Sequence, residues 1–240
     1  MAAPPTAPWV TVRRGTVSQS FDLSEQCARR LDRDDPLRSM GERFYRPADT
    51  VYLAGNSLGL ACQDAEAALQ HRLDEWKRLG VRGWLDGEGP WFHYAEAMGA
   101  LAATLVGAQP AEVVFTGTTT VNIHSLAATF FRPAGSRRKI LAGALSFPTD
   151  LYALRDQLRL RGCDPQADLV LVPSRDGRTI AEEDVIEQLT DQIALVLLPS
   201  VLYRSGQLLD LERLTRAARD RDIPIGFDCC HSVGALPHRL

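Results

Sequence analysis

Lysine is scarce in this sequence. Lys77 and Lys139 are the only lysines among the 27 lysine and arginine residues, so arginine supplies almost all of the positive charge. Reactions that need a lysine amine therefore have only two candidates within these 240 residues. The formal net charge is −3, which gives no electrostatic reason to expect a nucleic acid or an anionic membrane as a partner.

Long apolar runs are missing as well. No stretch reaches the roughly 20 apolar residues that a membrane-spanning helix needs. Residues 1–15, MAAPPTAPWVTVRRG, lack the apolar core and the cleavage site of a secretory signal. The sequence has no C-x-x-C pair and no pair of histidines at metal-binding spacing. We therefore expect a cytoplasmic protein without a metal site, with reduced thiols at its five cysteines, Cys27, Cys62, Cys163, Cys229 and Cys230.

Two common phosphate-binding motifs are also missing. The sequence has no G-x-x-x-x-G-K-[ST], which excludes a P-loop. It has no G-x-G-x-x-G after a strand either, which argues against a Rossmann-type dinucleotide site. Any phosphate-bearing ligand would have to be bound in another way.

The sequence does contain a regular alternation of strands and helices. The strands are continuous apolar runs, which are typical of a parallel sheet that helices cover on both faces. This pattern predicts an α/β fold with a doubly wound, mainly parallel sheet. The predicted strands are 112–116, 139–145, 168–174, 193–201 and 224–228, and the helices between them lie at about 120–131, 149–160, 181–189 and 210–221.

The domain organisation predicted from this pattern has two parts. Residues 1–60 are expected to form an N-terminal arm with a short helix near 23–31. At 51–60, VYLAGNSLGL predicts a short strand that breaks into a loop. Residues 61–240 are expected to form a large α/β domain.

Helix ends are also readable in the sequence. Apolar spacing predicts helices at 62–79 and 93–106, with Gly80 and Gly107 as their ends. The Thr-x-x-Glu spacing of TIAE (179–182) predicts a capping box at the start of a later helix.

Polar residues follow four of the predicted strands. Ligands of open parallel sheets bind beyond the carboxyl ends of the strands, so these segments are the candidates for a site. They are TGTTTVN (116–122), SFPTD (146–150), VLYRSGQ (201–207) and DCCHSVG (228–234).

Three features of these segments have both an ordinary and a functional interpretation. The threonines of 116–122 begin a helix, where they either cap it or bind a phosphate. Phe147 alone is more typical of a core aromatic than of a plate on which a flat ring stacks. Asp150 is either a simple first-turn acid or part of a site.

Asp228 ends an apolar strand and is harder to explain by packing. A buried acid there is a helix cap, a metal ligand or the partner of a buried cation. A cationic heteroaromatic cofactor with a phosphate fits Asp228, Phe147 and the threonines together. Pyridoxal phosphate is such a molecule, since an acid keeps its pyridine nitrogen protonated.

At this point the sequence resembles the kynureninases, a family of fold-type I pyridoxal-phosphate enzymes. The resemblance covers residue 50 to the end. It rests on YLAGNSLGL, TVNIHSL, SFPTDLYAL, YRSGQ and GFDCCHSVGAL, in that order and at family-like spacing.

The resemblance implies a role for each matching residue. Thr119 and Thr120 would bind the cofactor phosphate, and Phe147 would stack on the pyridine ring. Asp228 would pair with the pyridinium nitrogen, and His231 would lie beside the cofactor. Pro148, Thr149 and Asp150 would line the same pocket, and Asn56, Ser57 and Trp84 would lie near the substrate.

The resemblance also implies an activity. Kynureninases hydrolyse the Cβ–Cγ bond of L-kynurenine, or of its 3-hydroxy form, in tryptophan catabolism and NAD biosynthesis. The products are anthranilate, or 3-hydroxyanthranilate, and L-alanine. Fold-type I enzymes usually build their active sites at a homodimer interface, so a homodimer is expected for the full-length protein.

One part of the family pattern is missing. The lysine that holds the cofactor is expected about two dozen residues after Asp228, beyond Leu240. The small C-terminal domain, with an arginine for the substrate carboxylate, would lie beyond it too. We therefore expect an N-terminal portion of a kynureninase that is inactive alone. The alternatives are another fold-type I enzyme, such as a cysteine desulfurase or a class V aminotransferase, and a non-catalytic paralogue.

Overall fold

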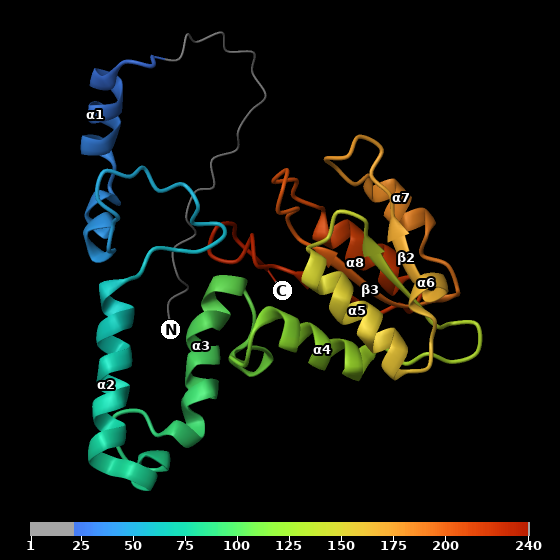
Figure 1. The fold of residues 1–240 in the computed structure, drawn as a ribbon, viewed down its shortest axis with the longest axis horizontal. Coiled ribbons are helices and arrows are strands. Elements are labelled where there is room, and N and C mark those ends of the chain that lie inside the picture. Colours follow the sequence, from blue (N-terminus) through green and yellow to red (C-terminus); the bar gives the residue numbers. More distant parts are fainter. Residues whose placement is uncertain (1–21, 240) are drawn as a thin grey trace, which may run out of the picture. The chain divides into compact units, whose positions relative to one another are not determined.

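The computed structural model describes residues 22–239 (Figure 1). The chain divides into two compact units, Met1–Leu73 and Asp74–Leu240. The boundary falls within helix α2 (Gln63–Leu79). The division into an arm at 1–60 and a large domain at 61–240 stays a prediction.

The first unit contains α1 (Glu25–Asp34) and the 3-10 helix η1 (Arg38–Arg43). Ser24 caps α1, because its hydroxyl accepts a hydrogen bond from the N–H of Cys27 at 3.2 Å. The strand predicted at the start of 51–60 is wrong. These residues form irregular chain and a turn, in which the N–H of Ser57 donates to the carbonyl of Ala54 at 2.9 Å. Among the described residues this segment has no strand to pair with.

The second unit begins with the end of α2 and continues through three 3-10 helices and α3 (Tyr94–Val106). The predicted helix ends are confirmed, since Gly80 and Gly107 have φ values of 55° and 67°. Only glycine adopts this left-handed conformation without a steric cost. The 3-10 helices are η2 (Gly80–Trp84), η3 (Trp91–His93) and η4 (Pro110–Glu112).

A four-stranded parallel sheet forms the centre of the second unit, as the sequence predicts. Its strand order is β2-β1-β3-β4, so the chain enters at β1 and winds outward in both directions. The strands are β1 (Lys139–Gly143), β2 (Leu169–Val172), β3 (Ile193–Pro199) and β4 (Ile225–Asp228). The helices around them are α4 (Thr119–Phe130), α5 (Pro148–Leu160), α6 (Pro165–Asp168), α7 (Glu182–Glu187) and α8 (Leu211–Arg219).

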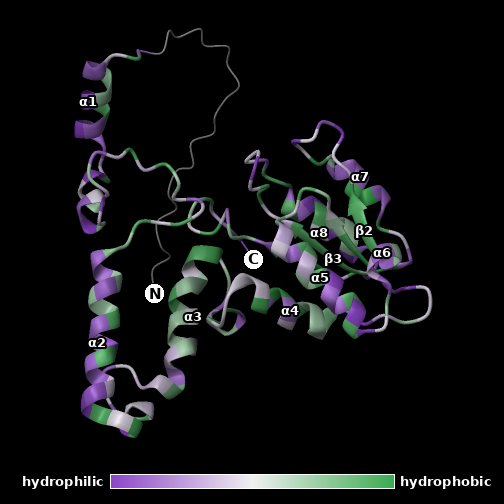
Figure 2. Cartoon of the chain, viewed as in Figure 1, coloured by the Kyte–Doolittle hydropathy of each residue, from purple (hydrophilic) through white to green (hydrophobic). Residues whose placement is uncertain are grey.

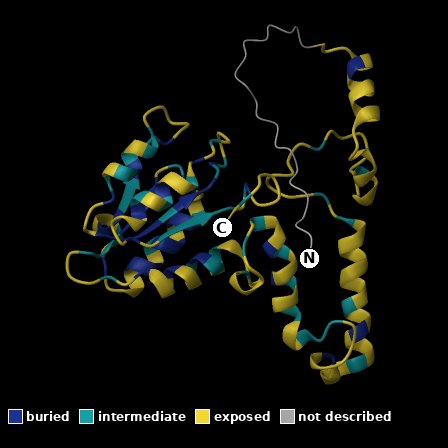
Figure 3. Cartoon of the chain, turned by 180° about the vertical axis from the view of Figure 1, so that it is seen from behind, coloured by how far each residue is buried: buried dark blue, intermediate teal, exposed yellow. Residues whose placement is uncertain are grey.

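Two apolar cores lie on the two faces of this sheet. Along β1, Ile140 and Ala142 pack with α4 and α5, whereas Leu141 packs with α7 and α8. The alternation follows from the strand geometry, which points successive side chains to opposite faces. Figure 2 shows hydrophobic residues along the strands, and Figure 3 shows that buried residues concentrate in the sheet and the helices that cover it.

The predicted strand at 112–116 is not a strand. Val113–Thr116 follow η4 as extended chain, and no described strand pairs with them. Val114 and Phe115 are 66% and 57% exposed. The apolar run therefore does not mark a buried strand here, although its sequence pattern is the same. β4 is an edge strand of the sheet and pairs only with β3 among the described strands.

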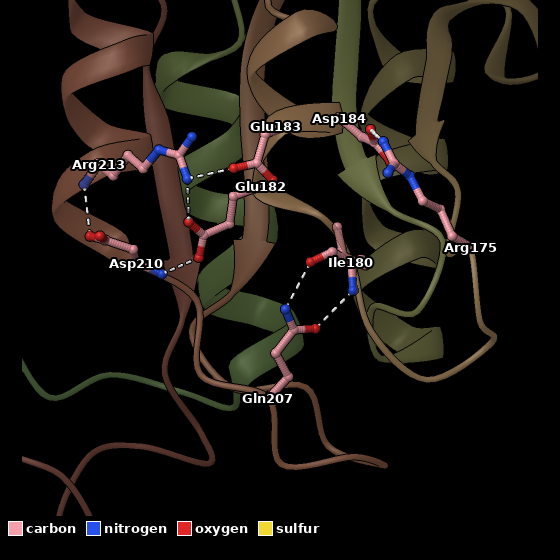
Figure 4. Close-up of polar contacts among 8 residues, drawn as sticks. All are labelled: Arg175, Ile180, Glu182, Glu183, Asp184, Gln207, Asp210 and Arg213. Atoms are coloured by element: carbon pink, nitrogen blue, oxygen red, sulfur yellow. Dashed lines mark hydrogen bonds and ion pairs between the residues drawn. The ribbon is translucent and has the colours of Figure 1, made fainter. Parts of the chain in front are cut away.

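The predicted capping box at 179–182 is wrong. The Oγ1 of Thr179 donates to Asp176 at 2.7 Å instead of capping α7, whose N-cap is Ala181. The carboxylate of Glu182 accepts a hydrogen bond from the N–H of Asp210 at 2.6 Å (Figure 4). Glu182 thus contacts the start of α8, and no side-chain hydrogen bond caps α7 at Ala181.

Polar contacts also fix the loop between β3 and α8. The side-chain amide of Gln207 donates to the carbonyl of Ile180 and accepts from its N–H, both at 2.8 Å (Figure 4). On the neighbouring surface, Arg213 contacts Glu182 and Glu183. The loop that carries Tyr203 and Arg204 is thus tied to the start of α7.

The α5 side of the core supplies a test of the fold. Leu154 is fully buried among β1 and α4, so L154A is expected to lower the free energy of unfolding by about 3 kcal/mol. L160A, at an exposed site of the same helix, is the control and should change it by less than about 0.5 kcal/mol. Urea unfolding followed by circular dichroism measures both. Equal effects of the two substitutions would contradict the packing of α5.

Candidate functional site

The polar segments that follow β1, β3 and β4 come together with the start of α4. The Oγ1 of Thr119 lies 3.2 Å from the Sγ of Cys230, which joins α4 to the chain after β4. Behind them, the hydroxyls of Ser200 and Ser232 are 2.7 Å apart and buried. All of these contacts lie at the carboxyl ends of parallel strands, where the topology places a site.

Two carboxyl groups lie at the centre of this region. Asp150, in the first turn of α5, is buried and only 3% exposed, and Asp228, at the end of β4, is half-buried and close enough for its charge to act on Asp150. Burial raises the pKa of Asp150 to about 7, and the negative charge of Asp228 adds to this effect. Asp228 also accepts a hydrogen bond from the N–H of Cys230 at 2.9 Å.

No cation is paired with this carboxyl pair among the described residues. Two adjacent buried carboxyl groups are stable only if they share a proton or meet a positively charged group. The pair is therefore suited to a cationic ligand.

An aromatic wall stands beside the carboxyl pair. Phe147, the residue before α5, is 41% exposed. The interpretation of Phe147 as a core aromatic, which its residue type alone favours, is therefore wrong. The ring of Tyr203 meets it edge-on, with centroids 5.1 Å apart and an interplanar angle of 76°. On its other side, Tyr203 stacks near His231, with centroids 6.4 Å apart. The three rings form a surface on which a flat ligand can pack.

The start of α4 is the third element of the site. Thr118 caps this 12-residue helix and Thr119 is its first residue, followed by Thr120. The first-turn N–H groups and the helix dipole make such a start favourable for an anion, and the Thr119 hydroxyl adds a further donor. The thiol of Cys230 beside it stays protonated, because desolvation raises its pKa to about 11.

A large cavity connects the start of α4 with β4. Its volume is about 860 Å³, and its lining includes Thr119 and Asp228. On one side lie α4 and the extended residues 114–117, and on the other lie β4 and Cys230. Most of the lining is apolar, and its polar members include Thr116, Thr119, Asn122 and Asp228.

Other residues predicted for the site are less directly placed in it. Pro148 and Thr149 begin α5, next to Phe147. Trp84 packs edge-on against Trp91, with centroids 6.2 Å apart, and does not line the cavity among the described residues. Asn56 and Ser57 lie in an exposed turn of the first unit. Their roles toward a substrate stay predictions.

Two residues of the site were not predicted from the sequence. Tyr203 lies in YRSGQ, directly after a predicted strand. This position at a strand end is the sequence feature that indicates a place in the site. Cys230 lies in the candidate segment 228–234 without a predicted role, but it lines the cavity and contacts Thr119. β4 ends at Asp228, as the sequence predicts, so the position of Cys230 just beyond the strand was the available signal.

Comparison with known proteins agrees with this geometry. Residues 51–240 match the family model described as aminotransferase class-V. The chain belongs to the aminotransferase class-V family. It is 53% identical over 222 residues to the kynureninase of Bacillus anthracis, covering 92% of this chain and 52% of that protein. The kynureninase of Geobacillus thermodenitrificans is 52% identical over 221 residues, with the same coverage. The chain therefore spans about half the length of the curated relatives it matches.

Solved structures share the fold of this class-V chain. A mutant of the lyase C-DES, with glycine covalently linked to its PLP cofactor, matches with a TM-score of 0.68 and 18% identity, over 82% of this chain and 51% of that one. The cysteine desulfurase CsdA from Escherichia coli matches with a TM-score of 0.65 and 16% identity, over 84% of this chain and 50% of that one. At this identity the likeness concerns the fold alone.

In residues 22–239 no helix is both long and apolar enough to cross a bilayer. The same part of the chain holds no group of three or more His, Cys, Asp or Glu side chains arranged for a metal ion.

The carboxyl pair predicts a dependence of stability on pH. Asp150 keeps its proton up to about pH 7 in the folded chain, compared with 3.8 as its ordinary pKa. The folded state therefore binds more protons between these values, so the free energy of unfolding falls as the pH rises through this window. D150N is expected to remove most of the fall and to be more stable than the wild type by about 1–2 kcal/mol near pH 8.

Urea unfolding at several pH values between about 4 and 8 measures this effect. D191N, at an exposed site, is the matched control and should follow the wild-type curve. A D150N curve parallel to that of the wild type would contradict the raised pKa.

Proposed function

We propose that the full protein to which this chain belongs is a kynureninase. It would bind pyridoxal phosphate and hydrolyse L-kynurenine, or its 3-hydroxy form, to L-alanine and anthranilate, or 3-hydroxyanthranilate. The observation that carries the proposal is the pair of the buried Asp150 and the half-buried Asp228, which has no cation partner among the described residues. The exposed Phe147 directly precedes the helix of Asp150, and Thr119 at the start of α4 contacts Cys230, two residues after Asp228. The identity of 53% to a curated kynureninase supports it.

The residues present fit this cofactor. The pair Asp150–Asp228 offers a negative charge for a protonated pyridine nitrogen, and Phe147 offers an exposed ring face. Thr119 and Thr120 offer hydroxyls and N–H groups at the start of a helix for a phosphate. The chemistry that each part of the cofactor requires is thus available in one region of the second unit.

The proposed roles follow from these positions. When bound, pyridoxal phosphate supplies an electron sink for the bond that is broken. Asp228 keeps the ring nitrogen protonated, and Asp150 holds the proton that the pair shares. Phe147 and His231 fix the plane of the ring, with Tyr203 between them. Pro148 and Thr149 begin the helix that positions Asp150. Asn56, Ser57 and Trp84 are proposed to approach the substrate.

A lysine for this site has to come from outside the described chain. Lys77 forms an ion pair with Asp74 at 2.8 Å on α2. Lys139 opens β1, at the end of the strand opposite to Phe147 and Asp150. We therefore propose that the reactive lysine, and an arginine for the substrate carboxylate, belong to the other half of the protein. A cytoplasmic homodimer is part of the same proposal.

The Asp228 carboxylate supplies the test of this function. In the full-length protein, wild type is expected to release anthranilate from L-kynurenine, followed by fluorescence. D228N should lower kcat/KM at least about 100-fold, because the pyridine nitrogen loses its anionic partner. D191N, an exposed acid outside the site, should change it by less than about twofold.

The same assay has two outcomes against the proposal. A wild type that binds pyridoxal phosphate but leaves kynurenine intact would indicate another fold-type I activity or a non-catalytic paralogue. A D228N enzyme with wild-type activity would exclude the proposed role of Asp228.

A further inference from the structure

A second, smaller hollow shares Tyr203 with the aromatic wall. Its volume is about 230 Å³, and it is formed by the turn after β1, the start of α5 and the loop after β3. Its polar lining includes Tyr152, Arg155, Tyr203 and Arg204. Tyr203 also contacts Phe147, so the hollow borders the proposed cofactor site without sharing its carboxyl pair. We call it the Arg155–Arg204 hollow.

The charge of this hollow is positive. Two guanidinium groups line it, and no carboxylate is among its lining residues. Within the part of the chain that the structure describes, neither Arg155 nor Arg204 forms a hydrogen bond or an ion pair. Neighbouring Arg159, in contrast, is paired with Asp156 on the same helix. The hollow therefore lacks the counter-charge that nearby arginines have.

The two arginines are held on supported elements. Arg155 lies half-buried in α5, whose buried face packs in the core. Arg204 lies in a loop closed by two hydrogen bonds, Leu202 N–H to the Gln207 carbonyl at 2.9 Å and Leu209 N–H to the Ser200 carbonyl at 3.0 Å. The side chain of Gln207 ties this loop to Ile180 (Figure 4). Such support lowers the entropy lost when a ligand orders the guanidinium groups.

The chemistry of the lining indicates the class of ligand. Arginine binds a carboxylate with two parallel hydrogen bonds. The rings of Tyr152 and Tyr203 offer aromatic surface next to the two arginines. A small molecule with both a ring and a carboxylate would use both features. The volume is too small for a macromolecular partner.

We propose that the Arg155–Arg204 hollow binds a small aromatic carboxylate. The proposal rests on the proposed function, because anthranilate, the expected product, is a molecule of this class. The hollow would hold the product, or an aromatic acid of similar shape, beside the cofactor site. The ring of the bound molecule would then contact Tyr203, which in turn contacts Phe147 of the aromatic wall.

Benzoate is the probe that tests this proposal. Its affinity for the full-length protein, with cofactor bound, is measured by isothermal titration calorimetry. The double variant R155Q/R204Q is expected to weaken benzoate binding at least about tenfold, since both charged hydrogen-bond donors are lost. R159Q, which removes a paired arginine of the same helix, should leave the affinity within about twofold of the wild type.

Two further probes separate the contribution of the ring from that of the charge. Benzyl alcohol, which has the ring without the charge, and acetate, which has the charge without the ring, should both bind more weakly than benzoate. Equal binding of acetate and benzoate would overturn the aromatic part of the proposal, and an unchanged affinity in R155Q/R204Q would overturn all of it. If the double variant does not fold, R204Q alone supplies the test, because Arg204 is exposed.

The result can be read independently of the proposed function. Benzoate binding requires no turnover, so an enzyme that releases anthranilate but binds benzoate equally well without the two arginines overturns the hollow alone. A protein that does not cleave kynurenine, yet binds benzoate through Arg155 and Arg204, overturns the proposed function alone.

Discussion

The contact between Asp150 and Asp228 is the constraint on which the site depends. The buried Asp150 lies beside the half-buried Asp228, and burial raises the pKa of Asp150 to about 7. This arrangement costs stability at neutral pH, because one of the groups has to keep a proton or meet a cation. Proteins retain such unfavourable contacts mainly where function needs them. The pair is thus the strongest physical indication that the strand ends form a ligand site.

The strand order of the sheet makes this contact possible. β3 lies between β1 and β4, so the segments that follow the three strands are neighbours in space. The turn after β1 supplies Phe147 and Asp150, the loop after β3 supplies Tyr203, and the end of β4 supplies Asp228. Asp228 is in register with Pro199, the last residue of β3. β1 and β4 are two strand positions apart, about 10 Å, so the turn after β1 has to reach past the end of β3 to meet Asp228.

Polar contacts away from the site support the same arrangement. Gln207 holds the loop that carries Tyr203, and the ion pairs of Arg213 join α8 to α7. These contacts join α7 to α8, although no side-chain hydrogen bond caps α7 at Ala181. The likeness to a cysteine desulfurase concerns the fold, whereas the match to the aminotransferase class-V family covers residues 51–240, which include the site segments. Phe147 is exposed near the carboxyl pair, so its ring is available for the proposed cofactor to stack on.

The fold class, four of the five predicted strands and the segments that carry the site are readable from the sequence. Continuous apolar runs identify buried parallel strands, and glycines at 80 and 107 end helices, because both signals are local. Three features become visible only in the folded chain: 113–116 has no strand partner among the described residues, Cys230 contacts Thr119, and Tyr203 contacts Phe147. Pairing and side-chain contacts join residues far apart in the chain, such as Thr119 and Cys230, and no local pattern encodes that distance.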